Sequence, residues 1–375
     1  MILLFDPAPP QLQWRLVCDG TDAVRTVGMD GDWPAAIVKH LPRDGRLEAI
    51  GYVLNNGGDE ITEAVGLLTP ETVRRLEDTV HLLPEHNEIT LEVAKFFMRR
   101  NPEVAHVLFC DTAFFTRLPP SVRDYALPRE VTERGVHRYG GYGLCHELMW
   151  RQAHALTGGS ARKVISIYLG DRSNLAAIQD GTPVETTIGL THLEGVLSSQ
   201  GCGDIDPTII FQLGAAGFSY SEINRMLSTE SGFTALAGRP CHLADIAGDS
   251  TDPGLAAARR MLVYQVVKYV GAMLASLGGA DALAFVGADL SEIMPLVRDL
   301  CDSLAFLGVR CERDVGRGTS SAYVTGPSGI GLSGAGFWEV SAGDSAIKVF
   351  VSGYDPWEMM SEQVRGMISK GKEQA

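Results

Sequence analysis

The stretch KVISIYLGDRSNLAAIQDG, residues 163–181, decides the fold class of this chain. Lys163 to Leu169 is a mostly apolar run with the length of a strand, and Asn174 to Gln179 is a second such run. Asp180-Gly181 follows as a turn dipeptide. A helical pattern at 146–156 precedes the two runs. Strand patterns that alternate with helical ones are typical of an α/β protein.

The same alternation occurs in the N-terminal part. Ile2 to Phe5 predicts a buried strand that stops at Asp6-Pro7, and Gln11 to Cys18 predicts a second strand hairpinned onto it. The remaining patterns predict helices at 70–83, 91–100, 207–213, 219–227, 256–277, 294–307 and 354–368, and strands at 105–109 and 282–286. Each half runs strands, then helix, then strand, which indicates a duplicated α/β unit.

Length and charge limit the possible classes of protein. The 375 residues predict two domains at about 150 residues each. The net charge of −14 argues against a nucleic-acid binder, because no basic excess is present to neutralise phosphates. The N-terminus lacks the basic region of a signal peptide, and no apolar run is long enough to predict a membrane span.

Seven cysteines are present without a C-x-x-C pair, and this spacing argues against a zinc ribbon, a redox dithiol or a disulfide framework. Their irregular spacing favours a reducing compartment, and we expect a cytoplasmic protein. Gly329 to Gly336 is glycine-rich but does not follow a predicted strand and open a helix, so we expect a flexible connection there.

Several ordered motifs carry a family resemblance. Leu83-Pro-Glu-His-Asn87 is similar to L-x-P-L-H-N, and Arg138 to His146 parallels R-Y-G-F-H-G-T-S-H. The strongest match runs without a gap from Tyr168 to Pro207, against H-L-G-N-G…D-T-S-M-G-x-T-P-L-E-G…R-S-G-D-I-D-P. Further matches are Ile50-Gly51, Gly57-Gly58, Phe109 to Phe114, Leu118 to Pro120 and Tyr125 to Pro128. Together these motifs resemble the acetate kinase family of acyl-phosphate-forming kinases.

The resemblance implies a fold and an activity. The fold would be that of the sugar-kinase and actin-like superfamily, with two β-β-β-α-β-α-β-α domains around a cleft. It places the N-terminal domain at 1–112 plus a returning helix at 351–375, and the second domain at 113–350. The family implies ATP, Mg²⁺, a small carboxylate or acyl phosphate, and a homodimer through the second domain. It implies neither a nucleic-acid nor a membrane partner.

The departures from the family pattern fall on the residues of phosphoryl transfer. One family arginine falls on or near Val53, a second on Gly201, and the central histidine becomes Tyr142. Phosphoryl transfer depends on cations that stabilise the moving charge, and losing one arginine costs roughly 3 to 7 kcal/mol of transition-state stabilisation. The resemblance therefore predicts a divergent member without ordinary ATP-dependent acetate kinase activity.

The segments that match the nucleotide motifs are altered as well. The first phosphate loop, N-A-G-S-S-S in the family, is replaced by Asp6-Pro-Ala-Pro-Pro-Gln11, which lacks hydroxyls and several backbone N–H donors. The second loop, H-L-G-N-G, is replaced by Tyr168-Leu-Gly-Asp-Arg172. The adenosine motif S-D-M-R falls near 240–243, G-G-I-G-E-N near 288–292, and the C-terminal glutamate pair near 356–357.

The resemblance and the residues together suggest a set of site candidates. As catalytic candidates we take His86, Asp111, Tyr142 and Arg172, as nucleotide-binding candidates Asp6, Tyr168, Gly170 and Asp171, and as candidate Mg²⁺ ligands Asp6 and Asp111. Alternatives stay open at three positions. Asp111 could instead cap the turn that follows it, His86 could be structural, and Arg172 could bind an anion or pair with Asp171 or Asp6 and plug the nucleotide site.

Two further functions stay open. The first is an active kinase or acyl-phosphate-using transferase for a different carboxylate, with Arg117, Arg138 or Arg172 supplying charge from new positions. The second is a non-enzymatic regulatory or assembly role that uses the dimer.

Overall fold

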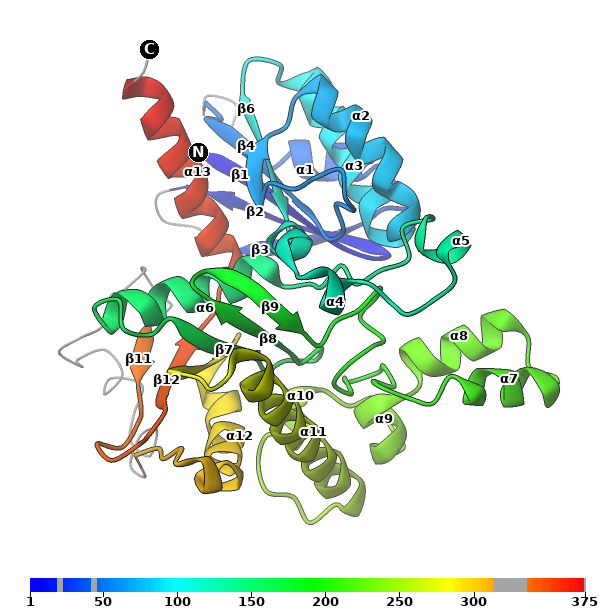
Figure 1. Ribbon diagram of the computed structural model, residues 1–375. Coiled ribbons are helices and arrows are strands. Elements are labelled where there is room, and N and C mark those ends of the chain that lie inside the picture. Colours follow the sequence, from blue (N-terminus) through cyan, green and yellow to red (C-terminus); the bar gives the residue numbers. More distant parts are fainter. Residues whose placement is uncertain (19–22, 42–45, 313–335, 374–375) are drawn as a thin grey trace. The chain divides into compact units, whose positions relative to one another are not determined.

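The computed structural model describes residues 1–18, 23–41, 46–312 and 336–373, so most of the predicted flexible connection at 329–336 lies outside the described residues. Residue contacts divide the chain into two compact units (Figure 1). Unit 1 comprises Met1–Thr116, Gly141–Leu144 and Asp355–Ala375, and unit 2 comprises Arg117–Gly140 and Cys145–Tyr354.

Unit 1 contains a six-stranded sheet in the order β3-β2-β1-β4-β6-β5. Strands β1, β4 and β6 are parallel, and the other neighbours pair antiparallel. The bounds are β1 Ile2–Ala8, β2 Gln11–Val17, β3 Val24–Gly28, β4 Ala49–Leu54, β5 Val65–Leu67 and β6 Ala105–Cys110. The central strands are almost wholly buried, as expected for strands covered on both faces.

Strand β1 is longer than the sequence predicts. We expected it to stop at Asp6-Pro7, but Asp6 to Ala8 continue to pair with Gln13 to Gln11 of β2. The pairing of β1 with β4 ends at Phe5. Beyond that residue β1 has a strand on one side only, where a proline without an N–H is tolerated.

Helices of unit 1 pack on the central strands. Helix α3 (Pro84–Arg100) and helix α13 (Pro356–Glu373) both contact β1 and β4. Helix α3 begins seven residues earlier than its apolar pattern predicts, with Pro84 in the first turn, where a missing N–H costs nothing. The other helical segments are α1 Trp33–Val38, α2 Pro70–Thr79 and a 3₁₀ turn at Val80–Leu82.

Unit 2 repeats the sheet of unit 1, with the order β11-β12-β10-β7-β8-β9. In each sheet three antiparallel strands continue into two parallel strands, and a short antiparallel strand closes the other edge. The bounds are β7 Lys163–Tyr168, β8 Asn174–Gln179, β9 Thr182–Thr186, β10 Ala282–Gly287, β11 Phe337–Glu339 and β12 Lys348–Gly353. The duplicated α/β unit predicted from the sequence is confirmed.

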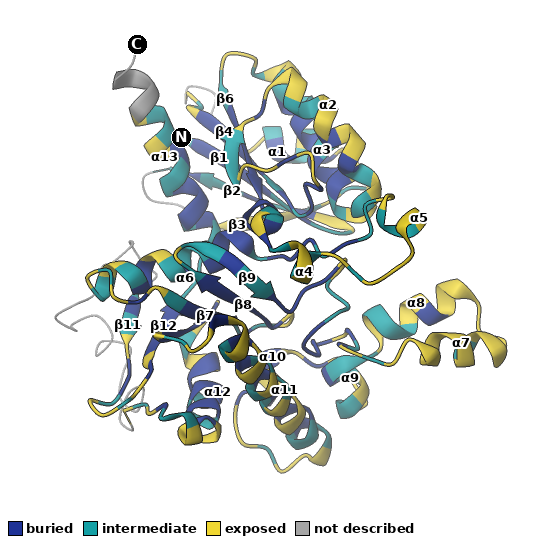
Figure 2. Ribbon diagram, viewed as in Figure 1, coloured by how far each residue is buried: buried dark blue, intermediate teal, exposed yellow. Residues whose placement is uncertain are grey.

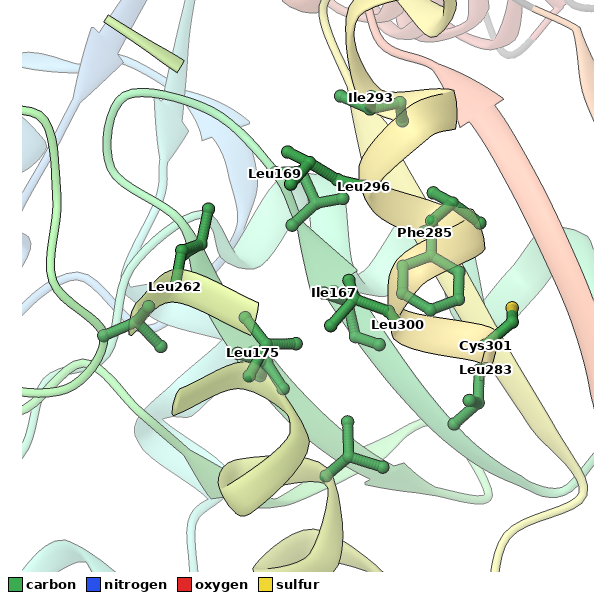
Figure 3. Close-up of a cluster of buried hydrophobic side chains, with 14 of the residues drawn as sticks. Ile167, Leu169, Leu175, Leu262, Leu283, Phe285, Ile293, Leu296, Leu300 and Cys301 are labelled. Carbon is green, nitrogen blue, oxygen red and sulfur yellow. The ribbon is translucent and has the colours of Figure 1, made fainter. Parts of the chain in front are cut away.

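Helices cover the sheet of unit 2. Helix α11 (Pro253–Leu277) packs on β7, β8 and β9, and α12 (Leu290–Ser303) packs on β10 and β12. Their apolar side chains meet those of the strands in one cluster (Figure 3). The other helical segments are α4 Pro120–Arg123, α5 Arg129–Thr132, α6 Gly143–Leu156, α7 Thr208–Ala215, α8 Tyr220–Thr229, α9 Gly232–Ala237, α10 Leu243–Ile246, and 3₁₀ turns at Ala113–Arg117 and Ala305–Leu307.

The structure bears on three expectations from the sequence: where the chain returns to the first domain, whether a disulfide forms, and whether a helix could span a membrane. Residue 351, where we placed the return to the first domain, lies inside β12, and the contacts return to unit 1 at Asp355. Cys301 and Cys311 form a disulfide, although the cysteine spacing predicted none. None of the helices in the described ranges is long and apolar enough to span a membrane.

Candidate functional site

Two site candidates of unit 1 lie where the parallel pairing of its sheet ends, Asp6 inside β1 and Asp111 just after β6. Asp6 comes directly after Phe5, the last residue of β1 that pairs with β4. Asp111 follows the end of β6, and its N–H donates to the Leu54 carbonyl at the end of β4 over 2.9 Å. Carboxyl ends of neighbouring parallel strands meet at one edge, so these two side chains share an environment.

Asp111 is bonded to the start of helix α6. Its Oδ2 accepts from the Tyr142 N–H at 2.6 Å, and the amides of Gly143 and Leu144 also stabilise the carboxylate. Its carbonyl accepts from the Gly143 N–H at 3.0 Å, and a Cβ at residue 143 would collide with that oxygen. Asp111 therefore caps a helix, but one that begins 32 residues later in the chain rather than the turn that follows it.

Asp6 and Asp111 are both buried, and burial disfavours a carboxylate charge. Burial and the charge of Asp111 raise the pKa of Asp6 to about 7. Burial raises the pKa of Asp111 to about 6, and the amides at the start of α6 oppose that rise. Among the described residues, no cationic side chain lowers the pKa of either carboxyl group, and only backbone amides oppose the rise at Asp111.

The donor set at this edge does not fit Mg²⁺. The ion prefers several charged or polar oxygen ligands in octahedral geometry. The Oδ2 atom of Asp111 already accepts from the Tyr142 N–H. Within the described part of the chain, no three His, Cys, Asp or Glu side chains gather as a metal group would require.

Two other candidates of unit 1 lie at helix starts. His86 is half-buried in the first turn of α3, beside Asn87. The buried Asn87 amide donates to the carbonyls of Asn56 at 2.7 Å and Thr79 at 3.1 Å, so this residue of the motif is structural. Tyr142 is half-buried just before α6 and has a φ of 56°, a left-handed conformation that is strained for a bulky side chain.

Val53 and Gly201, to which the sequence match assigns or nearly assigns the two family arginines, carry no charge. Val53 lies in β4, where its carbonyl accepts from the Thr90 hydroxyl at 2.7 Å. In unit 2, Gly201 donates its N–H to Ser198 Oγ at 2.7 Å, in a tight turn. A Cβ at residue 201 would lie 2.7 Å from the same oxygen, so a larger side chain would fit there only if Ser198 moved.

The segment that matches the first phosphate loop is part of a β-hairpin of unit 1. Only Pro9 and Pro10 lie outside the paired residues of β1 and β2. Prolines have no N–H, and the other amides of the hairpin belong to strands. This segment therefore lacks the converging backbone donors that cradle a phosphate.

The second phosphate segment, in unit 2, is closed by its own side chains. The Tyr168 ring lies against Gly170, because a Cβ there would lie 2.6 Å from its Cε1 atom. Asp171 Oδ2 accepts from His242 Nδ1 at 2.6 Å, and its Oδ1 accepts from the Leu243 N–H at 2.8 Å. The Asp171 carboxylate raises the pKa of His242. A contact thus joins the second phosphate segment to the adenosine segment, and it cannot be predicted from the sequence because the two residues are 71 positions apart.

The arginines that could supply charge differ in their contacts. Arg138 forms an ion pair with Glu194 at 2.5 Å and lies over the Tyr125 ring at 5.3 Å. Arg117 donates to the Gly181 carbonyl at 3.1 Å. Arg172 is exposed, and within the described ranges it makes no ion pair with Asp171, which is occupied by His242.

His146 of the R-Y-G motif is a structural residue of unit 2. It is fully buried, with Nδ1 2.8 Å from Ser166 Oγ and Nε2 2.6 Å from Asn174 Oδ1. Burial lowers its pKa to about 4, so the ring is neutral at physiological pH. It joins α6 to β7 and β8 rather than offering a charge.

Comparison with known proteins gives one consistent family. The model of the Acetokinase family matches residues 35–328. The chain is 31% identical to an acetate kinase of Halothermothrix orenii over 81% of this chain and 74% of that protein, and 34% identical to one of Gloeothece citriformis over 71% and 67%.

Solved structures share the fold. An acetate kinase of Porphyromonas gingivalis superposes with a TM-score of 0.83 at 23% identity, covering 98% of this chain and 99% of that one. A propionate kinase of Francisella tularensis gives a TM-score of 0.78 at 21% identity, covering 96% and 97%. The sheet order, the ordered motifs and these matches lead to one conclusion, that the chain belongs to the acetokinase family.

Proposed function

We propose that this protein is a divergent member of the family that does not catalyse ordinary ATP-dependent phosphorylation of acetate. The observation that carries the proposal is the charge at the carboxyl edge of the unit 1 sheet. Asp6 and Asp111 are buried there, no cationic side chain in the described ranges lowers the pKa of either, and the sequence match places a family arginine on or near Val53. An anionic carboxylate and a phosphoryl group would be repelled where the family pattern needs positive charge.

The altered nucleotide segments support the same proposal. The first is a hairpin that turns at two prolines, and the second has its carboxylate bonded to His242 and Leu243. We propose that ATP and Mg²⁺ bind weakly or not at all. A ligand that binds only the folded chain adds about 2.7 kcal/mol of stability at 100 times its dissociation constant, so binding is measurable as a thermal shift.

The decisive experiment is a hydroxamate assay with acetate, propionate and butyrate in the presence of Mg-ATP. The acetate kinase of Halothermothrix orenii serves as the positive control. We expect no turnover above background for this protein. Acetyl phosphate formation by the purified protein that is lost in Asp111→Asn would overturn the proposal. The Asn side chain keeps an oxygen acceptor for the helix cap, so the loss would not be explained by the loss of that contact.

Thermal-shift titrations with millimolar ATP, ADP or GTP plus Mg²⁺ test the nucleotide part separately. We expect no saturable rise in melting temperature. A clear, saturable shift would reject the proposal that the nucleotide segments do not bind ATP. It would favour an active kinase for a different carboxylate. In that case Arg172→Gly distinguishes two roles: stronger binding would identify Arg172 as an obstruction, and lost binding would identify it as a ligand.

One observation favours the second candidate, an active kinase or acyl-phosphate-using transferase for a different carboxylate. Arg172 is exposed beside the second phosphate segment and leaves its Asp171 neighbour to His242. A guanidinium in that position suits an anionic ligand. Screening a carboxylate panel with acyl phosphates as donors tests this candidate.

We also propose that the protein is a homodimer, which is the basis of the non-enzymatic alternative. Much of α7, α8 and the loop between them is exposed (Figure 2), and several of the exposed residues there and on α11 have large apolar side chains. They are Ile209, Ile210, Phe211, Phe218 and Tyr220, together with Met261 and Tyr264. Aromatic side chains of this kind are enriched at protein interfaces.

A further inference from the structure

The disulfide of unit 2 joins two elements that differ in their exposure to solvent. Cys301 lies near the C-terminal end of α12, and Cys311 lies beyond the Ala305–Leu307 turn, in a bridge with Ser341. Their Cα atoms are 6.3 Å apart, within the range that a disulfide spans. Cys301 is 3% exposed, whereas Cys311 is only half-buried.

The surroundings of the two sulfurs differ as well. Cys301 belongs to the apolar cluster that contains Leu283 and Leu300, and Figure 3 shows it on α12 beside them. Cys311 lies at the edge of that cluster, where the next residue, Glu312, donates its N–H to the Val340 carbonyl. A small thiol or disulfide from solvent therefore has access to the Cys311 sulfur first.

The remaining cysteines indicate the conditions under which the chain normally exists. The other five, Cys18, Cys110, Cys145, Cys202 and Cys241, form no disulfide. Five cysteines outside a disulfide, two of them half-buried, fit the reducing cytoplasm that we expect from the sequence. In such a compartment a disulfide forms reversibly, as a response to an oxidant.

We propose that Cys301 and Cys311 form a reversible thiol–disulfide site, in which exchange with low-molecular-weight disulfides begins at Cys311. The Cys311 thiolate attacks the small disulfide and releases one small thiol, which gives a mixed disulfide at Cys311. The Cys301 thiolate then attacks the Cys311 sulfur and releases the second small thiol. Two protons leave the cysteines, and their two electrons reduce the small disulfide.

The geometry predicts that the second step is slow. Cys301 is buried and lies near the carbonyl end of α12, and both features disfavour a thiolate. The mixed disulfide at Cys311 should therefore accumulate before the internal bridge closes. Once closed, the bridge fastens the end of α12 to the segment beside β12 and restricts the unfolded chain.

The chemical test uses the full chain with reduced or oxidised glutathione, followed by alkylation of free thiols under denaturing conditions. We expect seven alkylated cysteines in the reduced protein and five in the oxidised one, in agreement with two bridged and five free cysteines. Trypsin cleaves after Arg298, Arg310 and Arg313, so the bridge joins peptide 299–310 to peptide 311–313. In Cys301→Ser we expect glutathione to remain on Cys311.

Three outcomes would overturn the proposal. They are seven free thiols after oxidation of the folded chain, a bridge to any of the other five cysteines, and a disulfide that excess dithiothreitol fails to reduce without denaturant. The last outcome would identify a permanent structural bridge instead of a reversible one.

The physical test is the melting temperature in the two redox states. We expect the oxidised protein to melt about 5 °C higher than the reduced protein, because the bridge restricts the unfolded chain. Cys311→Ser and Cys311→Ala should both lose this dependence, whereas Cys202→Ser, also half-buried in unit 2, should keep it. An equal redox shift in the Cys311 variants would show that the bridge is not the cause.

Discussion

At the scale of single residues, Asp6 and Asp111 are two buried carboxyl groups of unit 1 whose pKa values are raised. Asp6 stands where the family pattern has an asparagine, and its charge faces that of a second buried carboxylate. Burial and this repulsion raise the pKa of Asp6 to about 7. The folded chain therefore holds a proton that the unfolded chain releases at lower pH.

The first prediction concerns Asp6→Asn and the pH dependence of stability. Between the ordinary pKa of 3.8 and the folded value of about 7, the unfolded carboxyl loses its proton first, so stability falls as pH rises. Asp6→Asn removes this penalty. We expect the variant to exceed the wild type by about 1 to 3 kcal/mol at pH 8, and by less at pH 5.

Urea unfolding at the two pH values measures this difference. Asp78→Asn, on the exposed face of α2, is the matched control and should show no pH-dependent gain. A gain in Asp6→Asn that is equal at both pH values would contradict the assigned cause.

The second prediction concerns Asp111 as a helix cap. Asp111→Ala removes an acceptor from the amides of Tyr142, Gly143 and Leu144, and we expect a loss of about 1 to 3 kcal/mol of stability. Asp111→Asn retains one oxygen acceptor and should lose less. Chemical denaturation measures the unfolding free energy of both variants. Equal losses would show that the hydrogen bonds to the amides do not cause the loss of stability.

At the scale of elements, the second phosphate segment and helix α10 are joined through one carboxylate. The Asp171 carboxylate accepts from the His242 ring and from the Leu243 backbone N–H. Asp245 of α10 accepts from the backbone N–H of His242 at 2.9 Å. Asp171 raises the pKa of His242 most, and Asp245 adds to the rise. The contact is largely exposed, so its effect on global stability is small.

The third prediction is a change in the titration of His242. A raised folded-state pKa means that the ion pair contributes fully below the ordinary value of 6.5 and is lost as pH rises through the raised value. We expect nuclear magnetic resonance to show a lower His242 pKa in Asp171→Asn than in the wild type. Asp249→Asn is the control, and an unchanged His242 pKa in Asp171→Asn would refute the pairing in solution.

At the scale of the whole molecule, the chain repeats one sheet order in two units and carries apolar side chains that neither unit buries. Phe211 is 74% exposed on α7, and Tyr220 is 85% exposed on α8. The central strands of both sheets are buried (Figure 2). Exposed aromatic residues of this size are costly in a monomer and typical of an interface.

The fourth prediction tests the proposed homodimer. We expect light scattering to give twice the chain mass of 40.4 kDa for the wild type and a smaller mass for the combined variant Phe211→Asp and Tyr220→Asp. Phe306→Asp is the matched control, because Phe306 is 77% exposed on the turn after α12 and lies away from α7 and α8 in the chain. A wild-type monomer, or a dimer unaffected by the combined variant, would reject this interface.

The sequence by itself determined the family and the repeated α/β order. Runs such as Lys163 to Leu169 predict a strand from a few neighbouring residues. The family motifs and their order along the chain can likewise be recognised from the sequence without a structure. Only the tertiary structure decided that Asp111 caps α6, that Asp171 binds His242, and that Cys301 bonds Cys311. Each of these contacts joins segments that meet only because the chain folds back on itself, and no local period or spacing encodes such a meeting.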